Sequence, residues 1–331
     1  MRSSSVRVID MSEYDFLVAK IHGKLARMLA RDDIQALESA GMEAITQRLH
    51  DTNYGPALGE AGKGGASDDL RRGFFLDIEN LFFSLQGDDR ALLVDVLARY
   101  RVENLKTIIR AHVYHVPPEQ GASKIFHLPW ERVDYKKWLS SGSLEGMLQE
   151  IPWARYRSKL HAVHRQVGEA ETTFNYEVAL DNVYLQNLIQ RLGSSSAGIK
   201  SILHNRLLRE IISWAFRLKD YGYSFPEMIN FLPDFRSLIP QDELQMIIEE
   251  GEGWRRMARF FSGELKEEWE KEQGFDVDLS DLLFDRQLVG LVRRSFIISE
   301  PGIESVIGYV YLKEIELSWL IEAVEKAKVR N

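Results

Sequence analysis

The sequence predicts an all-α fold, and three observations support this prediction. Apolar side chains recur at intervals of three and four residues along most of the chain, several of these segments begin with helix-capping residues, and strand-like segments are few. The segments Val6–Ile9 and Lys124–His127 resemble strands but are too short to build a sheet. The clearest periodic segment runs from Ala91 to Ala111, where one stripe contains Leu93, Val96, Leu97, Tyr100, Leu105, Ile108 and Ile109.

The remaining helices follow from the same periodicity. We expect them over residues 12–29, 67–85, 143–149, 153–167, 177–192, 199–220, 241–250, 254–273, 278–293 and 302–329, with a short amphipathic helix between Ile34 and Leu49. Asp88 and Asp89 place negative charge where the first N–H groups of a helix lack partners. Ser224 and Glu227 have the spacing of a capping box, which predicts another helix start.

Composition excludes several classes of function. The chain has 331 residues, a formal net charge of −8 and no cysteine, so disulfides, thiolate metal sites and cysteine nucleophiles are impossible. A nucleic-acid binder usually carries a basic face, and this chain is acidic. No apolar run approaches the roughly 20 residues that span a bilayer, and no apolar segment of a signal peptide follows Met1–Ser5. We therefore expect no nucleic-acid partner and no direct membrane span.

A weak internal repeat indicates three similar helical modules. Arg110 and Arg217 end similar helical segments, and a Ser-Trp pair recurs at Ser213-Trp214 and Ser318-Trp319, each at a step of roughly one third of the chain. We predict modules at residues 1–115 (with an N-terminal segment), 116–225 and 226–331. Three such modules around one axis would form a ring or a funnel.

Phosphate-loop chemistry is a poor match to the sequence. Gly62-Lys63 resembles the end of a phosphate-binding loop, but Ala57 stands where the first glycine is needed and Gly64 where a hydroxyl is needed. A mobile surface loop explains the segment better.

Metal sites are also weakly supported. His161 and His164 share one face of an expected helix, but a zinc site needs further ligands, and two half-exposed helix histidines are the simpler interpretation. Asp68-Asp69 is followed by arginines that would repel a metal, so we interpret the pair as a helix N-terminus. We therefore predict no catalytic, cofactor-binding or metal-binding residues.

Two features suggest surface roles. The run Lys266–Glu272 alternates both signs of charge, which is typical of a solvated helix face and less often of a charged docking surface. Trp138 and Trp269 stand among charged residues and are candidate interface anchors, whereas we expect most other tryptophans in the core.

Several segments, in order along the chain, resemble the C subunit of bacterial and archaeal V-type (A-type) ATP synthases, which is called the d subunit in the eukaryotic V-ATPase. The N-terminal match is YDFLVAKIHGKLAR at residues 14–27, Asp32-Asp33-Ile34, and LHDTNYG at residues 49–55. The internal match is YRVENLKTIIRA at residues 100–111, and FRLKDYGYS at residues 216–224 resembles the end of the middle-module helix. The segment from Tyr311 to Lys328 is only loosely similar to the family.

This resemblance implies an all-helical funnel of three modules that acts as a non-catalytic central-stalk (rotor) subunit. Its partners would be the central-stalk subunits of the catalytic head and the membrane rotor ring, on the cytoplasmic face of the membrane. It would couple proton or sodium transport to ATP synthesis or hydrolysis without an active site or cofactor of its own. A helical-repeat scaffold for an unrelated protein is the alternative, and an all-α enzyme with a carboxylate metal site is a third hypothesis.

Overall fold

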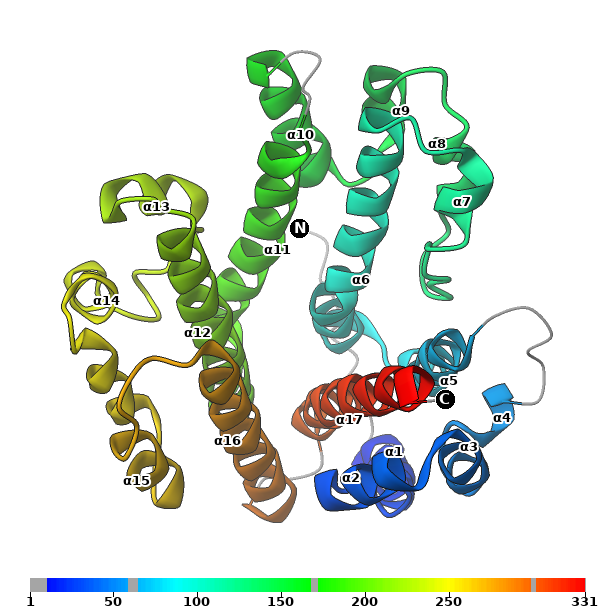
Figure 1. Cartoon of the computed structure of the whole chain (residues 1–331). Helices are drawn as coiled ribbons and strands as arrows, with labels where there is room; N and C mark the ends of the chain where they lie inside the picture. The colour runs from blue at the N-terminus through cyan, green and yellow to red at the C-terminus, as the bar shows by residue number, and fades with distance from the viewer. Residues whose placement is uncertain (1–10, 59–64, 168–171, 299–301, 331) are drawn as a thin grey trace, which may run out of the picture. The chain divides into compact units, whose positions relative to one another are not determined.

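The computed structural model describes residues 11–58, 65–167, 172–298 and 302–330. Within these ranges the chain is all helical and has no strand, which confirms the predicted fold class (Figure 1). Residues Lys124–His127 are irregular, and Val6–Ile9 lie outside the described residues. The chain divides into two compact units, unit 1 (residues 1–90 and 289–331) and unit 2 (residues 91–288). The division into three modules stays a prediction.

Unit 1 is built around the last helix of the chain, α17 (Ile303–Arg330). Every residue from Ser305 to Leu317 is buried, as expected of a helix that is covered on all sides. The helices that pack on it are α1 (Met11–Leu25), α2 (Arg31–Ala40), α3 (Met42–His50) and α5 (Ala66–Phe82), with the short α4 (Gly55–Leu58) packed on α5.

One glycine allows α17 to approach α16 (Val277–Ile298) closely. A Cβ atom added at Gly308 would lie 2.7 Å from Cγ1 of Val292, closer than real Cβ contacts allow. The C-terminal half of α16 therefore belongs to the packing of unit 1, and any side chain at position 308 would push the two helices apart.

Unit 2 contains the long helices α6 (Gly87–Val113), α11 (Phe174–Ser194) and α12 (Ala197–Asp220), drawn from cyan to yellow-green in Figure 1. Helix α10 (Ala154–Val167) packs on α11, which also packs on α12. Shorter elements complete the unit: α7 (Pro118–Ala122), α8 (Tyr135–Leu139), α9 (Leu144–Glu150), α13 (Phe225–Phe231), α14 (Gln241–Glu249), a 3-10 helix (Gly253–Phe260) and α15 (Glu264–Glu270).

The prediction of one helix over residues 254–273 was wrong. The chain forms the 3-10 helix, breaks at Phe261–Gly263 and then starts α15, because Gly263 adopts a φ of +56° that L side chains rarely take. The break lets Trp269 pack against Trp254, with ring centroids 5.5 Å apart and the indole N–H of Trp269 donating to the Trp254 carbonyl at 3.2 Å.

The expected helix starts are confirmed. Asp88 and Asp89 lie in the first turn of α6. Ser224 and Glu227 form a capping box at α13, in which the Glu227 carboxylate accepts the backbone N–H of Ser224 at 2.8 Å.

Candidate functional site

The long helices α6, α11 and α12 of unit 2 line a hollow of about 410 Å³. Its lining combines four cations, four carboxylates and four aromatic side chains, so its formal charge is balanced. The cations are Arg99, Lys106, Arg206 and Arg217; the carboxylates are Glu103, Glu177, Asp181 and Glu210; the aromatic residues are Phe174, Tyr184, Trp214 and Tyr221.

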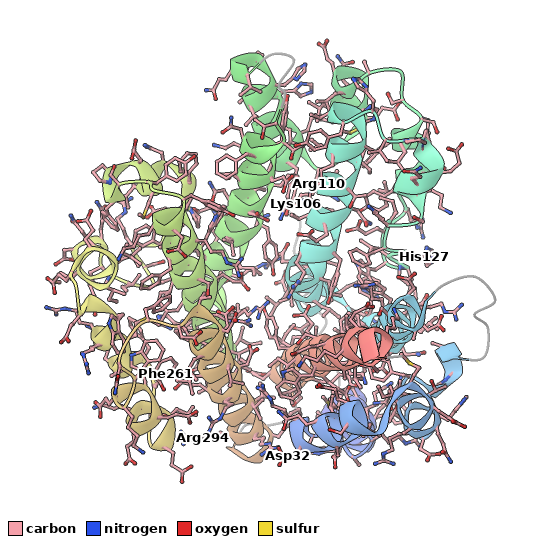
Figure 2. The ribbon with its side chains drawn as sticks, viewed as in Figure 1. Asp32, Lys106, Arg110, His127, Phe261 and Arg294 are labelled. Carbon is pink, nitrogen blue, oxygen red and sulfur yellow. The ribbon has the colours of Figure 1, made fainter. Side chains whose placement is uncertain are left out.

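Ion pairs cross the hollow from α6 to α11. Lys106 and Arg110 both project from α6 towards α11 (Figure 2). The Lys106 Nζ atom lies 2.7 Å from Oδ1 of Asp181 and 2.9 Å from Oε1 of Glu103. One turn further along, the Arg110 guanidinium donates two hydrogen bonds to the Glu177 carboxylate, an arrangement that fixes the relative orientation of the two groups.

A third pair continues this row at the other end of the hollow. The Arg191 Nε atom donates to Oδ2 of Asp95 at 2.6 Å, and the Tyr184 hydroxyl donates to the Val96 carbonyl at 3.3 Å. The two antiparallel helices are thus joined by polar contacts at three levels. Sliding one helix along the other would break all of them together, so the row stiffens unit 2.

The titration of the central pair reflects its surroundings. Burial raises the pKa of Asp181 to about 6, although Lys106 opposes this shift. Burial also works against the charge of Lys106, but Asp181 and Glu103 together raise its pKa above the usual value. Both members of the pair are therefore charged above about pH 6.

The α12 side of the hollow is also ion-paired. Arg206 Nη2 lies 3.0 Å from Oε1 of Glu210. Burial would raise the pKa of Glu210, but Arg206, Arg209 and two further arginines together hold it below its usual value. Beside them, Arg209 contacts Asp285 at 2.6 Å and Asp281 at 3.2 Å on α16.

Every carboxylate of the hollow therefore lies against a cation. Glu103 and Asp181 contact Lys106, Glu177 contacts Arg110, and Glu210 contacts Arg206. This arrangement fixes side chains and presents a patterned surface of both charges. Such a surface is suited to recognising a complementary protein.

Aromatic side chains give this surface candidate anchors. Tyr221 ends α12 and is 76% exposed, and the turn that follows it depends on Gly222, whose φ is +85°. Trp214 lies on the same helix and is half-buried in the lining. Trp, Tyr and Arg are the residues that most often carry the binding energy of protein interfaces, so the hollow has the composition of a docking site.

Unit 1 contains a different feature, a buried polar cluster around Glu316. Its Oε1 atom accepts the Leu29 backbone N–H at 2.6 Å, and its Oε2 atom accepts the Tyr54 hydroxyl at 3.1 Å and Lys313 Nζ at 2.5 Å. Lys313 is fully buried and Glu316 is 1% exposed. Burial lowers the pKa of Lys313, while burial and then Glu316 raise the pKa of Tyr54.

The cluster extends to α5 through Asp77. The Asp77 carboxylate accepts hydrogen bonds from Lys24 and from the Tyr309 hydroxyl, which in turn accepts one from Asn53 at 3.3 Å. These contacts join α1, α5, α17 and the turn after α3. Sequence reasoning noticed Tyr54 only in a family-like motif and missed the cluster. The signal was the charged run Lys313–Glu316, which directly follows the uncharged stretch Val306–Leu312 of the same helix.

Of the two histidines singled out in the sequence, His164 has a hydrogen-bond partner in the structure. His164 Nδ1 lies 2.7 Å from the Tyr176 hydroxyl, and His161 is half-buried on the same helix. Throughout the described part of the chain, no group of three or more His, Asp or Glu side chains could hold a metal ion.

Asp68 and Asp69 lie in the first turn of α5, as predicted. They pair with Arg71 and Arg72 at 3.2 and 3.3 Å. Gly62-Lys63 lies outside the described residues.

The expectation that Trp138 and Trp269 anchor an interface was wrong. Trp138 is 5% exposed and packs against Tyr135 and Trp153, and Trp269 is fully buried. Neighbouring charges in the sequence misled the prediction, because in both short helices the charged residues face water while the tryptophan faces inward. The charged run Lys266–Glu272 is largely exposed around Trp269.

The described residues thus form an all-helical protein with a charged and partly aromatic hollow in unit 2. Across the ranges that the structure covers, no helix is both long and apolar enough to cross a membrane. The family model described as ATP synthase (C/AC39) subunit matches residues 17–325. The chain therefore belongs to the ATP synthase (C/AC39) subunit family.

Individual relatives agree with this assignment at low identity. The chain is 22% identical to the A-type ATP synthase C subunit of Methanosarcina mazei over 69% of this chain and 65% of that protein. It is 20% identical to the same subunit of Methanosarcina barkeri over 76% of this chain and 74% of that protein. The match thus spans just under two thirds of the Methanosarcina mazei protein.

Proposed function

We propose that this protein is the central-stalk (rotor) coupling subunit of an A/V-type ATP synthase, between the stalk of the catalytic head and the membrane rotor ring. It makes or breaks no covalent bond and works from the cytoplasmic face, where it passes torque that links proton or sodium transport to ATP synthesis or hydrolysis. The family match over residues 17–325 is the observation that carries this proposal.

The hollow of unit 2 is the proposed seat for the stalk. Its balanced charges match a partner that also carries both signs, and Trp214 and Tyr221 supply apolar area for anchoring. A cavity of about 410 Å³ accommodates a few side chains of an inserted helix end, not a whole helix. We therefore expect the stalk to contact the rim and place a small number of residues inside.

Torque transmission also needs a body that does not shear. In unit 2 the ion pairs Lys106–Asp181, Arg110–Glu177 and Arg191–Asp95 join α6 to α11. In unit 1 the buried cluster around Glu316 fixes α17. Both features oppose sliding between helices, which is the deformation that a torque-transmitting protein must resist.

The alternative is a scaffold that binds an unrelated protein in the same hollow. The two functions are separated by measuring binding to the purified central-stalk subunits of the same organism's ATP synthase. We expect a stable complex, and the double variant Trp214→Ala/Tyr221→Ala should weaken it at least tenfold, since an interface anchor contributes about 2 kcal/mol or more.

Tyr114→Ala is the matched control, because Tyr114 is a 53% exposed tyrosine of unit 2 that does not line the hollow. Loss of binding in this control would argue against the hollow as the seat. Absence of any complex between the wild-type chain and the stalk subunits would leave the scaffold as the better hypothesis.

A further inference from the structure

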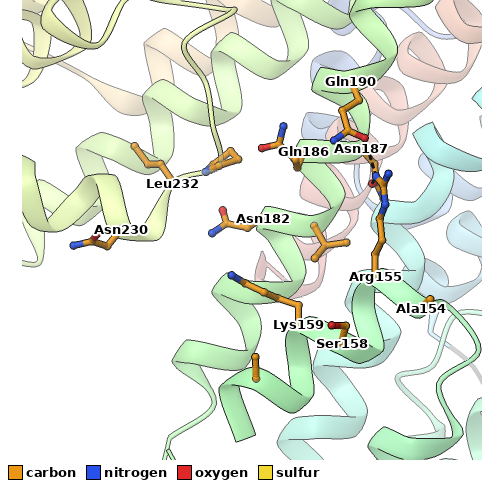
Figure 3. Close-up of a pocket in the computed structure, with 13 residues that line it drawn as sticks. Ala154, Arg155, Ser158, Lys159, Asn182, Gln186, Asn187, Gln190, Asn230 and Leu232 are labelled. Atoms are coloured by element: carbon orange, nitrogen blue, oxygen red, sulfur yellow. Dashed lines mark hydrogen bonds between the residues drawn. The ribbon is translucent and has the colours of Figure 1, made fainter. Parts of the chain in front are cut away.

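A second concave surface of unit 2 has a chemistry unlike that of the hollow. It is a groove of about 700 Å³ formed by α10, α11 and the end of α13 with the residues after it (Figure 3). Its thirteen lining residues are Ala154, Arg155, Ser158, Lys159, Ala162, Asn182, Val183, Gln186, Asn187, Gln190, Asn230, Leu232 and Pro233. Five of them are amides, two are cations, and none is acidic or aromatic.

The amides form a row along one face of α11. Asn182, Gln186 and Gln190 follow each other at four-residue spacing and therefore lie above one another on the helix. Asn230 of α13 also lines the groove. Each side-chain amide offers both donors and an acceptor, the same pair of functions that a peptide backbone presents.

One amide has an unused acceptor. The Oδ1 atom of Asn182 is buried and has no hydrogen-bond partner among the described residues. Buried acceptors in native proteins normally find a donor. The side chain as a whole is partly exposed and lines the groove, so a rotation of its amide would bring this oxygen to a donor of a bound ligand, such as a backbone N–H.

Two cations border the row. Arg155 and Lys159 are exposed and one turn apart on α10. Arg155 Nη1 donates to Oδ1 of Asn187 at 2.5 Å and to the Oε1 atom of Gln190 at 2.8 Å, as the dashed lines in Figure 3 show. These bonds hold the guanidinium in place without neutralising its charge.

No carboxylate of the described residues forms an ion pair with either cation. One acidic residue, Asp234, directly follows the groove residue Pro233 in the sequence. Its backbone N–H donates to Oε1 of Gln186 at 3.0 Å. Its carboxylate pairs with Arg236 at 2.7 Å, and hydrogen bonding to Arg236 lowers its pKa to about 2. The groove is therefore a positive site on a chain whose net charge is −8.

We propose that this groove binds an extended acidic peptide segment of a partner protein, with Arg155 and Lys159 contacting its carboxylates and the amide row contacting its backbone. Apolar residues such as Val183 and Leu232 accommodate the stems of its side chains. Nucleic acid fits less well, because single strands need stacking aromatics and several phosphate contacts, and the lining offers two cations and no aromatic ring.

The groove is distinct from the stalk seat. The groove residues Asn182 and Gln186 alternate along α11 with Asp181 and Leu185 of the hollow, so the two sites use different faces of one helix. Peptide binding in the groove would be a second function of unit 2, independent of coupling.

The test uses the full chain and a fluorescein-labelled hexaglutamate peptide as the probe, followed by fluorescence anisotropy at low salt. We expect saturable binding that the double variant Arg155→Glu/Lys159→Glu weakens at least tenfold. Arg165→Glu/Lys200→Glu is the matched control, since both residues are exposed cations of unit 2 outside the groove. Circular dichroism checks that each variant is folded.

Two further arms define the ligand class. Asn182→Ala/Asn230→Ala should weaken binding of hexaglutamate, and backbone N-methylation of the peptide should weaken its binding to the wild type, because both remove contacts between amides and backbone. The proposal is overturned if hexaglutamate does not bind, or if the control variant loses as much affinity as Arg155→Glu/Lys159→Glu. Equal displacement of the peptide by inorganic phosphate or by a ten-nucleotide oligothymidine would also overturn it, since either would show a general anion site.

Discussion

Replacing Glu316 by alanine should destabilise unit 1 strongly. The carboxylate is 1% exposed and accepts hydrogen bonds from Lys313, Tyr54 and the Leu29 backbone. Its removal leaves a fully buried ammonium group without its partner and a backbone N–H without its acceptor. Breaking a buried ion pair from one side costs about 3–5 kcal/mol, so we expect the free energy of unfolding to fall by about that amount.

The loss of stability depends on which groups of the buried cluster remain after the substitution. Lys313→Met should cost less than Glu316→Ala, because Glu316 would keep the Tyr54 hydroxyl and the Leu29 N–H while methionine fills the space of the lysine stem. The double variant Lys313→Met/Glu316→Leu replaces both charges by apolar groups of similar volume. It should therefore be more stable than the sum of the two single effects predicts.

The assay must report on unit 1 rather than on the whole chain. Hydrogen exchange of the α17 amides, followed by mass spectrometry across a urea series, measures the opening of the helix that carries the cluster. Lys326→Ala is the control, because Lys326 is a half-exposed lysine of the same helix that pairs with the exposed Glu322 and the partly exposed Glu38 outside the buried cluster. Its loss should leave protection nearly unchanged.

Two results would refute this reasoning. The first is a fall of less than about 1 kcal/mol in the free energy of unfolding of Glu316→Ala. It would mean that water reaches the carboxylate or that Lys313 is neutral, and that the two residues do not form a buried charged pair. Strict additivity of the two single variants in the double variant would mean that Lys313 and Glu316 do not interact.

Two other predictions follow from the packing and the electrostatics. Gly308→Ala should lower the free energy of unfolding by about 1–3 kcal/mol in urea, because the new methyl group would meet Val292. Gly290→Ala on α16 is the control, since its methyl group has open space and should raise stability by up to about 1 kcal/mol. Equal effects of the two substitutions would contradict the close approach of α16 and α17. Since the folded pKa of Asp181 is about 6, above its ordinary value of 3.8, the folded state binds the proton more tightly, and the stability that Asp181 contributes is lost as pH rises from about 4 to 6. Relative to Asp181→Asn, the wild type should lose up to about 3 kcal/mol between pH 4 and 7 in unfolding titrations, and a parallel pH dependence of the two proteins would rule this out.

Local patterns in the sequence predicted the long helices and most of their ends, but they missed the short helices α7 and α8 and did not separate α2 from α3 at Gly41. The stripe from Leu93 to Ile109 fixes the buried face of α6, and the capping box at Ser224 depends on residues three apart. The helix expected over residues 254–273 is divided by the positive φ of Gly263, which periodicity does not reveal. The buried positions of Trp138 and Trp269 likewise depend on partners that only the fold brings near.

Neither the buried cluster around Glu316 nor the hollow of unit 2 could be predicted from local sequence patterns. The buried cluster pairs Leu29 and Tyr54 with Glu316, residues more than 250 positions apart. The row of ion pairs in the hollow needs the antiparallel register of α6 and α11, which sets Lys106 opposite Asp181. The family resemblance indicated the class of protein without locating these residues.

The coupling function is tested most directly by ion transport in reconstituted vesicles. Catalytic head, central stalk and rotor ring are assembled with and without this chain, and ATP hydrolysis and ATP-driven proton or sodium uptake are measured together. We expect hydrolysis without uptake when the chain is absent, and uptake restored by the wild type but not by Trp214→Ala/Tyr221→Ala. Full ATP-driven uptake in vesicles that lack the chain would contradict its role as the coupling subunit.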